Sequence, residues 1–247
     1  MRIKLIVEYD GTAYAGWQRQ KNAVSVQQKI EEAVLKVTGK GAVVNGAGRT
    51  DAGVHALGQV AHFDTDSKIP PEKFAYALNA NLPQDIRIRS SNKTDEDFDA
   101  RRSAKIKHYR YLIYNAPQAN ALNRRICAHV SYPLDIEKMR AAASMLTGEH
   151  DFSSFCAAGS TPVKTKIRTI YEISVLKSGE YISIDVKGNG FLYNMVRIMA
   201  GTLIEAGKGK LTANDVGDIL LKKDRSAAPA TAPAKGLTMV EVSYKNV

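Results

Sequence analysis

The stretch 46–55 has the residue types of a reactive site. It reads Gly-Ala-Gly-Arg-Thr-Asp-Ala-Gly-Val-His, and its three glycines bracket Arg49 and Asp51 between two expected strands. Glycine permits positive φ angles and lets another molecule approach the backbone closely. A loop built so tightly around one guanidinium and one carboxylate fits a catalytic site, although an ion pair within a glycine-rich turn is the simpler interpretation.

Several familiar motifs are excluded. No Gly-Lys-Ser or Gly-Lys-Thr follows the glycines, so the loop is not a Walker A loop. The spaced carboxylates and the terminal Glu of an EF-hand are missing as well. Cys127 and Cys156 are the only cysteines and form no Cys-x-x-Cys pair, which argues against a zinc ribbon, a redox motif and a disulfide framework.

Charge is distributed unevenly along the chain. The 35 Lys and Arg exceed the 25 Asp and Glu, which gives a net charge of +10. Residues 1–100 are balanced at 13 basic and 13 acidic, whereas residues 101–247 have 22 basic and 12 acidic. The segment 101–134 has seven basic residues and no acidic one. This pattern favours a polyanionic partner, of which nucleic acid is the commonest, over a charge that serves only general solubility.

Composition is that of an ordinary globular chain, with 44% hydrophobic and 24% charged residues among its 247. No run of about 18 apolar residues predicts a membrane span, and the N-terminus lacks the apolar core of a signal peptide. We therefore expect a soluble protein in the cytoplasm, with no membrane partner.

The elements that must position the loop follow from periodicity. Over about 90 residues the pattern predicts the order β-α-β-β-α-β of a ferredoxin-like unit. Ser25 begins the first helix with a capping box and Gly39 ends it, while Pro70 and Pro71 open the second helix. The expected strands are 3–9, 42–44, 59–63 and 85–89, and the expected helices are 25–39 and 70–78.

A flip from acidic to basic residues near residue 100 predicts two domains, 1–100 and 101–247. The second repeats a similar order with one extra helix. Its expected strands are 108–114, 168–176, 181–187 and 237–244, and its expected helices are 135–148, 191–206 and 212–222. The resulting fold class is α+β: two ferredoxin-like or RRM-like units whose antiparallel sheets could join side by side.

The loop resembles the signature of the TruA family of tRNA pseudouridine synthases. Six further stretches resemble segments of that family in the same order, so the resemblance extends from residue 9 to about 240. The loop match is 48–56, and the others are 9–12, 16–19, 79–83, 109–111, 190–197 and 232–237. The stretches 118–125 and 157–166 carry no motif of this family, so their roles stay open.

The resemblance implies a pseudouridine synthase fold with the active-site cleft between the two units. It implies an isomerase that converts uridine to pseudouridine at positions 38, 39 and 40 of the tRNA anticodon stem-loop. Such enzymes act as homodimers on tRNA and use no metal and no small-molecule cofactor. The catalytic carboxylate corresponds to Asp51, which could attack C1′ or C6 or remove a sugar proton; the residues alone leave these routes open.

The resemblance also implies three substrate-binding residues. Arg49 corresponds to an arginine that helps to flip the target base, Tyr109 to the active-site tyrosine, and Arg197 to the partner of the catalytic aspartate. The simpler interpretations are a pair between Arg49 and Asp51 and core packing for Tyr109. We expect phosphate contacts from the basic residues of the second part, namely Arg101, Arg102, Lys105, Lys107, Arg110, Arg124, Arg125, Lys164, Lys166 and Arg168.

Two alternatives come from other classes. One is a non-catalytic basic RNA-binding protein with RRM-like units, but the aromatic RRM signature is missing. The other is a structural protein on ribosomal RNA, which has no need of charged residues in a glycine-rich loop. For His55, His62 and Trp17 we expect packing or hydrogen bonding rather than a direct role.

Overall fold

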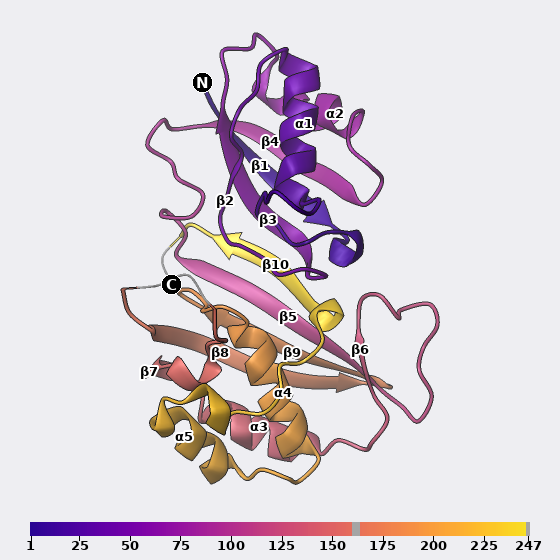
Figure 1. Ribbon diagram of the computed structural model, residues 1–247, viewed down its shortest axis with the longest axis vertical. Coiled ribbons are helices and arrows are strands. Elements are labelled where there is room, and N and C mark those ends of the chain that lie inside the picture. The colour runs from indigo at the N-terminus through magenta and orange to yellow at the C-terminus, as the bar shows by residue number, and fades with distance from the viewer. Residues whose placement is uncertain (160–163, 246–247) are drawn as a thin grey trace. The chain divides into compact units, whose positions relative to one another are not determined.

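The computed structural model describes residues 1–159 and 164–245 (Figure 1). The chain divides into two compact units, one of residues 1–105 with 238–247 and the other of residues 106–237. The expected boundary near residue 100 lies five residues before the break after Lys105. The first unit has 17 basic and 14 acidic residues and the second 18 and 11, so the excess charge is shared more evenly than between 1–100 and 101–247.

The first unit has the expected β-α-β-β-α-β order. Strand β1 (Arg2–Tyr9) pairs antiparallel with both β3 (His55–Asp64) and β4 (Ile86–Thr94), and the two-residue β2 (Asn45–Gly46) pairs with β3. The strand order is therefore β4-β1-β3-β2, as in a ferredoxin-like unit. The strand expected at 42–44 is wrong: Val44 gives its backbone N–H to a side chain of the first helix, and pairing begins only at Asn45.

Helices α1 (Val26–Thr38) and α2 (Phe74–Asn79) contact each other beside these strands (Figure 1). The alternation of Ile3, Leu5, Val7 and Tyr9 buries one face of β1, which forms the core of the unit. Ser25 caps α1 by accepting from the Gln28 N–H, and Gly39 ends the helix at a φ of 73°. Only half of the capping box is formed: the Ser25 side chain accepts from the Gln28 N–H, whereas the Gln28 side chain bonds to Glu32 through its Nε2.

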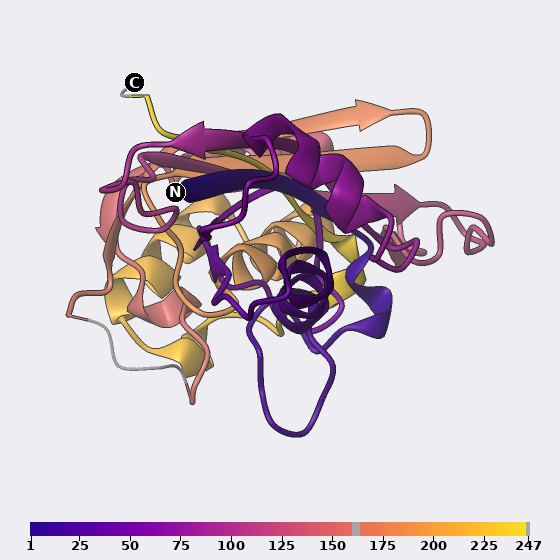
Figure 2. The same ribbon diagram turned by 90° about the horizontal axis from the view of Figure 1, so that it is seen from above.

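The second unit is also mixed. Strand β5 (Ile106–Asn115) pairs antiparallel with β9 (Tyr181–Gly188), followed by β8 (Ile167–Ser178) and β7 (Gly148–Asp151), while β6 (Ala128–Val130) runs parallel to β5. Helices α3 (Ile136–Ser144), α4 (Met195–Gly207) and α5 (Ala213–Lys222) lie on one side of the β8–β9 hairpin (Figure 2). The capping box at Thr212 and Asp215 is confirmed.

Three expectations for this unit need correction. Helix α4 begins at Met195, not near 191, because Asn194 takes a left-handed conformation at the N-cap (φ 58°). Helix α3 ends at Ser144, and Gly148 begins β7 instead of ending the helix. The final strand β10 (Leu237–Ser243) returns to the first unit, where Thr238 and Met239 pair parallel with β3.

Side-chain and backbone contacts explain this return. The backbone N–H of Lys105 donates to the carbonyl of Ser243, and the Tyr244 hydroxyl donates to the carbonyl of Ala100. The Tyr244 ring packs against Phe98 with its centroid 5.0 Å away. The mixed α+β, mostly antiparallel architecture is confirmed, whereas the joining of the sheets and a cleft between the units stay predictions.

His62 of β3 supports the segment that leads out of the first unit. Its buried Nδ1 accepts a hydrogen bond of 3.1 Å from the backbone N–H of Ala100, and its ring meets Phe98 edge-on. Burial, with a smaller contribution from the charge of Arg2, lowers the pKa of His62 below its ordinary 6.5. The structural role expected for this histidine is confirmed.

We predict that His62→Gln flattens the pH dependence of the free energy of unfolding. Because the folded pKa is lowered, the unfolded chain binds more protons below pH 6.5. The contribution of His62 is complete above that pH and is lost as the pH falls through the folded pKa. Urea unfolding between pH 7.5 and 5 measures the slope, with exposed His129→Gln as the control. Equal slopes in wild type and His62→Gln would contradict this role.

Candidate active site

The glycine-rich loop 46–54 is held by the segment 9–17, which follows β1. The backbone N–H of Trp17 donates to the carbonyl of Thr50 at 3.1 Å, and that of Gly53 donates to the carbonyl of Tyr14 at 3.3 Å. A turn closes the loop, since the N–H of Val54 donates to the carbonyl of Asp51 at 3.1 Å. The backbone on both sides of Asp51 is therefore fixed by hydrogen bonds.

Two glycines let the segment and the loop approach each other this closely. A Cβ on Gly11 would lie 1.9 Å from the carbonyl oxygen of Val54. A Cβ on Gly16 would lie 2.3 Å from that of Thr50, and Gly16 also has a φ of +89°, where other residues are strained. No side chain larger than hydrogen fits at either position without moving the loop.

Side chains divide the loop into an inner and an outer side. Thr50 is buried at 7% exposure, and its Oγ1 forms a 2.7 Å hydrogen bond with the hydroxyl of Tyr9. The amide Nε2 of Gln59 donates to the carbonyl of Gly48 at 2.7 Å. Arg49 is exposed and Asp51 is half-buried. The inward Thr50 thus leaves its two charged neighbours nearer the surface.

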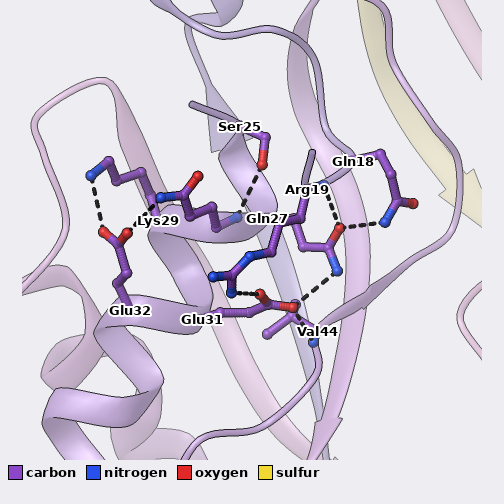
Figure 3. A network of polar contacts seen from close by, with 9 residues as sticks. Gln18, Arg19, Ser25, Gln27, Lys29, Glu31, Glu32 and Val44 are labelled. Atoms are coloured by element: carbon purple, nitrogen blue, oxygen red, sulfur yellow. Dashed lines mark hydrogen bonds and ion pairs between the residues drawn. The ribbon is translucent and has the colours of Figure 1, made fainter. Parts of the chain in front are cut away.

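Glu31 of α1 links the segment that follows Trp17 to the residue that precedes β2 (Figure 3). Its Oε2 accepts from Arg19 at 2.8 Å, and its Oε1 accepts from Gln27 at 2.9 Å and from the backbone N–H of Val44 at 3.2 Å. Gln27 in turn accepts from the amide of Gln18 and the N–H of Arg19, both at 2.8 Å. A carboxylate with a 10% exposed side chain is stable here because each oxygen has a donor.

His55 and Trp17 have the structural roles expected of them. The Nδ1 of buried His55 accepts from the backbone N–H of Gly11 at 3.1 Å, which fixes the start of the enclosing segment. Trp17 is 2% exposed, and its ring lies where a side chain on Gly46 would be. Both residues therefore pack around the loop.

Tyr109 lies in β5 of the second unit and is 7% exposed. Its ring meets Phe191 edge to face, with the centroids 5.2 Å apart and the planes at 85°. The neighbouring Tyr111 is fully buried and donates its hydroxyl to the carbonyl of Pro233 at 2.9 Å. Tyr109 thus has a mostly buried ring that Phe191 contacts at its edge.

Arg197 lies in the first turn of α4 and is half-buried. Its Nε donates to the carbonyl of Ala232 and its Nη1 to the side-chain oxygen of Asn194, both at 2.8 Å. Two donors of the planar guanidinium are thereby anchored to the unit, which orients the whole group.

The expected phosphate contacts differ in exposure. Arg110 donates to both oxygens of Asp185, at 2.9 and 3.1 Å, so its charge is already matched within the unit. Arg168 is half-buried, and its Nη1 donates to the carbonyls of Thr165 and Ile167. Burial lowers the pKa of Arg168. Lys164 and Lys166 are exposed. Lys107 is half-buried, and the other five are exposed, namely Arg101, Arg102, Lys105, Arg124 and Arg125.

The two unassigned stretches can be described only in part. In 118–125, the side-chain amides of Asn120 and Asn123 both donate to the hydroxyl of Tyr181. This arrangement holds a turn with an exposed Leu122. In 157–166, residues 160–163 lie outside the described residues.

Sequence reasoning did not single out Gln59, Glu31 or the hydroxyl of Tyr9. A polar Gln at an inward position of the strand 59–63 is the one signal that could have found Gln59. No cluster of three or more His, Cys, Asp or Glu that could hold a metal occurs among residues 1–159 and 164–245. In the same described part, no helix is long and apolar enough to cross a membrane.

Comparison with known proteins extends over nearly the whole chain. A family model described as tRNA pseudouridine synthase matches residues 5–101 and 142–245. The tRNA pseudouridine synthase A of Thermoanaerobacter sp. (strain X514) is 50% identical over 242 residues, which cover 98% of this chain and 99% of that protein. The proteins of the same name from Acetivibrio thermocellus and Brevibacillus brevis are 52% and 50% identical, with the same coverage of both chains.

We predict that Gly16→Ala destabilises the protein by roughly 1–3 kcal/mol, because it adds a Cβ at a positive φ against the Thr50 carbonyl. Gly41→Ala is the matched control, since its Cβ would meet nothing within 4 Å. Urea unfolding monitored by the fluorescence of Trp17 gives both values. If Gly16→Ala costs no more than Gly41→Ala, the close approach of the segment and the loop is wrong.

Proposed function

The chain belongs to the tRNA pseudouridine synthase family, and we propose that it is an isomerase that converts uridine to pseudouridine in tRNA. The reaction breaks the bond between C1′ and N1 and forms one between C1′ and C5. The C5 hydrogen leaves as a proton and N1 gains one, so no oxidant or reductant is needed. The observation that supports the proposal most directly is the enclosed loop that holds Asp51 beside an inward Thr50.

Asp51 is the catalytic residue in this proposal. A carboxylate can attack C1′ or C6, or remove a sugar proton, and each route starts from the ionised form. Its half-buried position on a loop fixed by the Trp17 and Gly53 hydrogen bonds suits it to meet a bound nucleotide. Rigid support of this kind is what a reacting group needs, because small displacements lower the rate strongly.

Arg49 acts on the substrate two residues before Asp51. A uridine within a stem must leave the base stack before its C1′ and C5 are accessible, which costs a few kcal/mol. The exposed guanidinium of Arg49 is suited to stack in the vacated space and to bind phosphate. Its place on the same fixed loop as Asp51 links extrusion of the base to the position of the carboxylate.

The second unit supplies Tyr109 and Arg197 in this proposal. In this proposal Tyr109 contacts the uracil ring, and its edge contact with Phe191 fixes the orientation of the phenol. The tRNA phosphates are contacted by exposed basic residues of both units, namely Arg101, Arg102, Lys105, Arg124, Arg125, Lys164 and Lys166. Arg110 and Arg168 are less suited, because their guanidinium groups already bond within the second unit.

Finer features of the proposal rest on the resemblance. They are the target positions 38, 39 and 40 in the anticodon stem-loop, the homodimer, the absence of a cofactor and metal, and the location in the cytoplasm. A non-catalytic RNA-binding protein is the alternative function. A tritium-release assay with tRNA labelled at C5 of uridine separates the two, since only an isomerase releases the label.

We predict that Asp51→Asn abolishes tritium release and leaves the Kd for tRNA near the wild-type value. The substitution removes the ionised carboxylate but changes little volume. Exposed Asp97→Asn of the same unit is the control and should release tritium normally. Normal turnover by Asp51→Asn would eliminate Asp51 as the catalytic residue.

We predict that the double substitutions Arg101→Ala with Arg102→Ala, and Arg124→Ala with Arg125→Ala, weaken tRNA binding. Each should reduce the slope of log K against log salt by roughly 1–2, as expected when two phosphate contacts are lost. Filter binding at several salt concentrations measures the slope. Exposed Lys68→Ala in the first unit should leave it unchanged. A slope equal to wild type in both double variants would remove these residues from the binding surface.

A further inference from the structure

We propose that the buried side chains of Tyr9, Thr50 and Gln59 form a positioning cluster that sets the geometry of the Asp51 loop for catalysis. This inference rests on the proposed function of Asp51 and assigns a task to three residues that do not themselves contact the substrate. The cluster lies within the first unit, on the inner side of the loop.

Two anchors hold the loop from the same side. The amide of Gln59 holds the Gly48 carbonyl at 2.7 Å, and the hydroxyl of Tyr9 holds Thr50 Oγ1 at 2.7 Å. These points lie on either side of Arg49, and the second is adjacent to Asp51. Fixing residues 48 and 50 restricts the dihedral angles through which either charged side chain could turn inward.

The two anchoring residues come from neighbouring strands with an irregular register. Val7 of β1 lies opposite Gln59, but Tyr9 lies opposite Ala56, so the register shifts between Val7 and Tyr9. An irregularity of this kind redirects a side chain and is frequent beside active sites. Tyr9 is the last residue of β1, and its hydroxyl bonds to Thr50 of the loop.

The amide of Gln59 has a feature that a packing role does not explain. Its side chain is fully buried, and within the described part of the chain its Oε1 is the one buried side-chain N or O atom with no hydrogen-bond partner. An apolar residue of similar length would fill the space without leaving such an atom. The bond from its Nε2 to the loop carbonyl is what the polar side chain adds.

Tyr9 acts as a neutral group in this cluster. Burial raises the pKa of its hydroxyl far above the ordinary value, although hydrogen bonds with Thr50 and Gln59 act in the opposite direction. The phenol therefore keeps its proton at all working pH values and serves as a hydrogen-bonding anchor rather than as an acid or base.

The test compares Tyr9→Phe and Thr50→Val with a matched control, Tyr244→Phe. Tyr244 also uses its hydroxyl in a hydrogen bond within the first unit, but it donates to the backbone carbonyl of Ala100, at 2.8 Å, and not to the loop. We expect kcat for tritium release to fall by roughly 10- to 100-fold in Tyr9→Phe and Thr50→Val, with KM for tRNA little changed. Thr50→Ser, which keeps the hydroxyl, should restore most of the kcat lost in Thr50→Val.

Hydrogen exchange without tRNA provides a readout that does not depend on activity. Amides of Trp17, Gly53 and Val54, which bond to or within the loop, should exchange faster in Tyr9→Phe while core amides of β1 do not. Tyr244→Phe should leave the loop amides unchanged.

Two results would overturn the cluster: unchanged exchange at the loop amides, or kcat values no lower than that of Tyr244→Phe. A wild-type protein that releases no tritium would defeat the proposed function instead, and the exchange data would still decide whether the cluster holds the loop.

Discussion

The site depends on one constraint, the backbone contact between the segment 9–17 and the loop 46–54. Hydrogen bonds from Trp17 to Thr50 and from Gly53 to Tyr14 join residues that are more than thirty positions apart in the chain. Because glycine occupies positions 11 and 16, the two backbones lie at distances that any side chain would prevent. The position of the loop therefore follows from the fold of the whole first unit rather than from the loop's own residues.

Three sets of polar groups around the contact also hold the loop and its enclosing segment in place. Glu31 ties the segment after Trp17 and the residue before β2 to helix α1. Tyr9 and Gln59 hold the inner side of the loop, and His55 holds Gly11 at the start of the enclosing segment. Buried polar groups are costly unless they are satisfied, so a cluster of them that converges on one loop limits it to a single conformation. That rigidity is the physical requirement for a carboxylate that must meet a displaced base.

Much of the fold followed from the chain's periodicity and capping residues. The order β-α-β-β-α-β, the caps at Ser25, Asp135 and Thr212, and the β8–β9 hairpin were all predictable, because each depends on local spacing. The errors lie where a distant contact overrides local preference. Val44 donates its backbone N–H to the carboxylate of Glu31 instead of pairing in a strand. Strand β10, which was expected in the second unit, pairs with β3 of the first.

By itself the sequence determined the residue types of the site, since a Gly-rich loop with Arg49 and Asp51 can be read from the order of residues. It also determined the membership of the family that the comparisons establish. Only the tertiary structure decided which side chains of the loop turn inward and what holds them. Thr50 bonds to Tyr9 and Gly48 bonds to Gln59, and these two anchors lie on the paired strands β1 and β3, whose register shifts between Val7 and Tyr9. Such a shift arises from the packing of the whole sheet and leaves no local pattern in the chain.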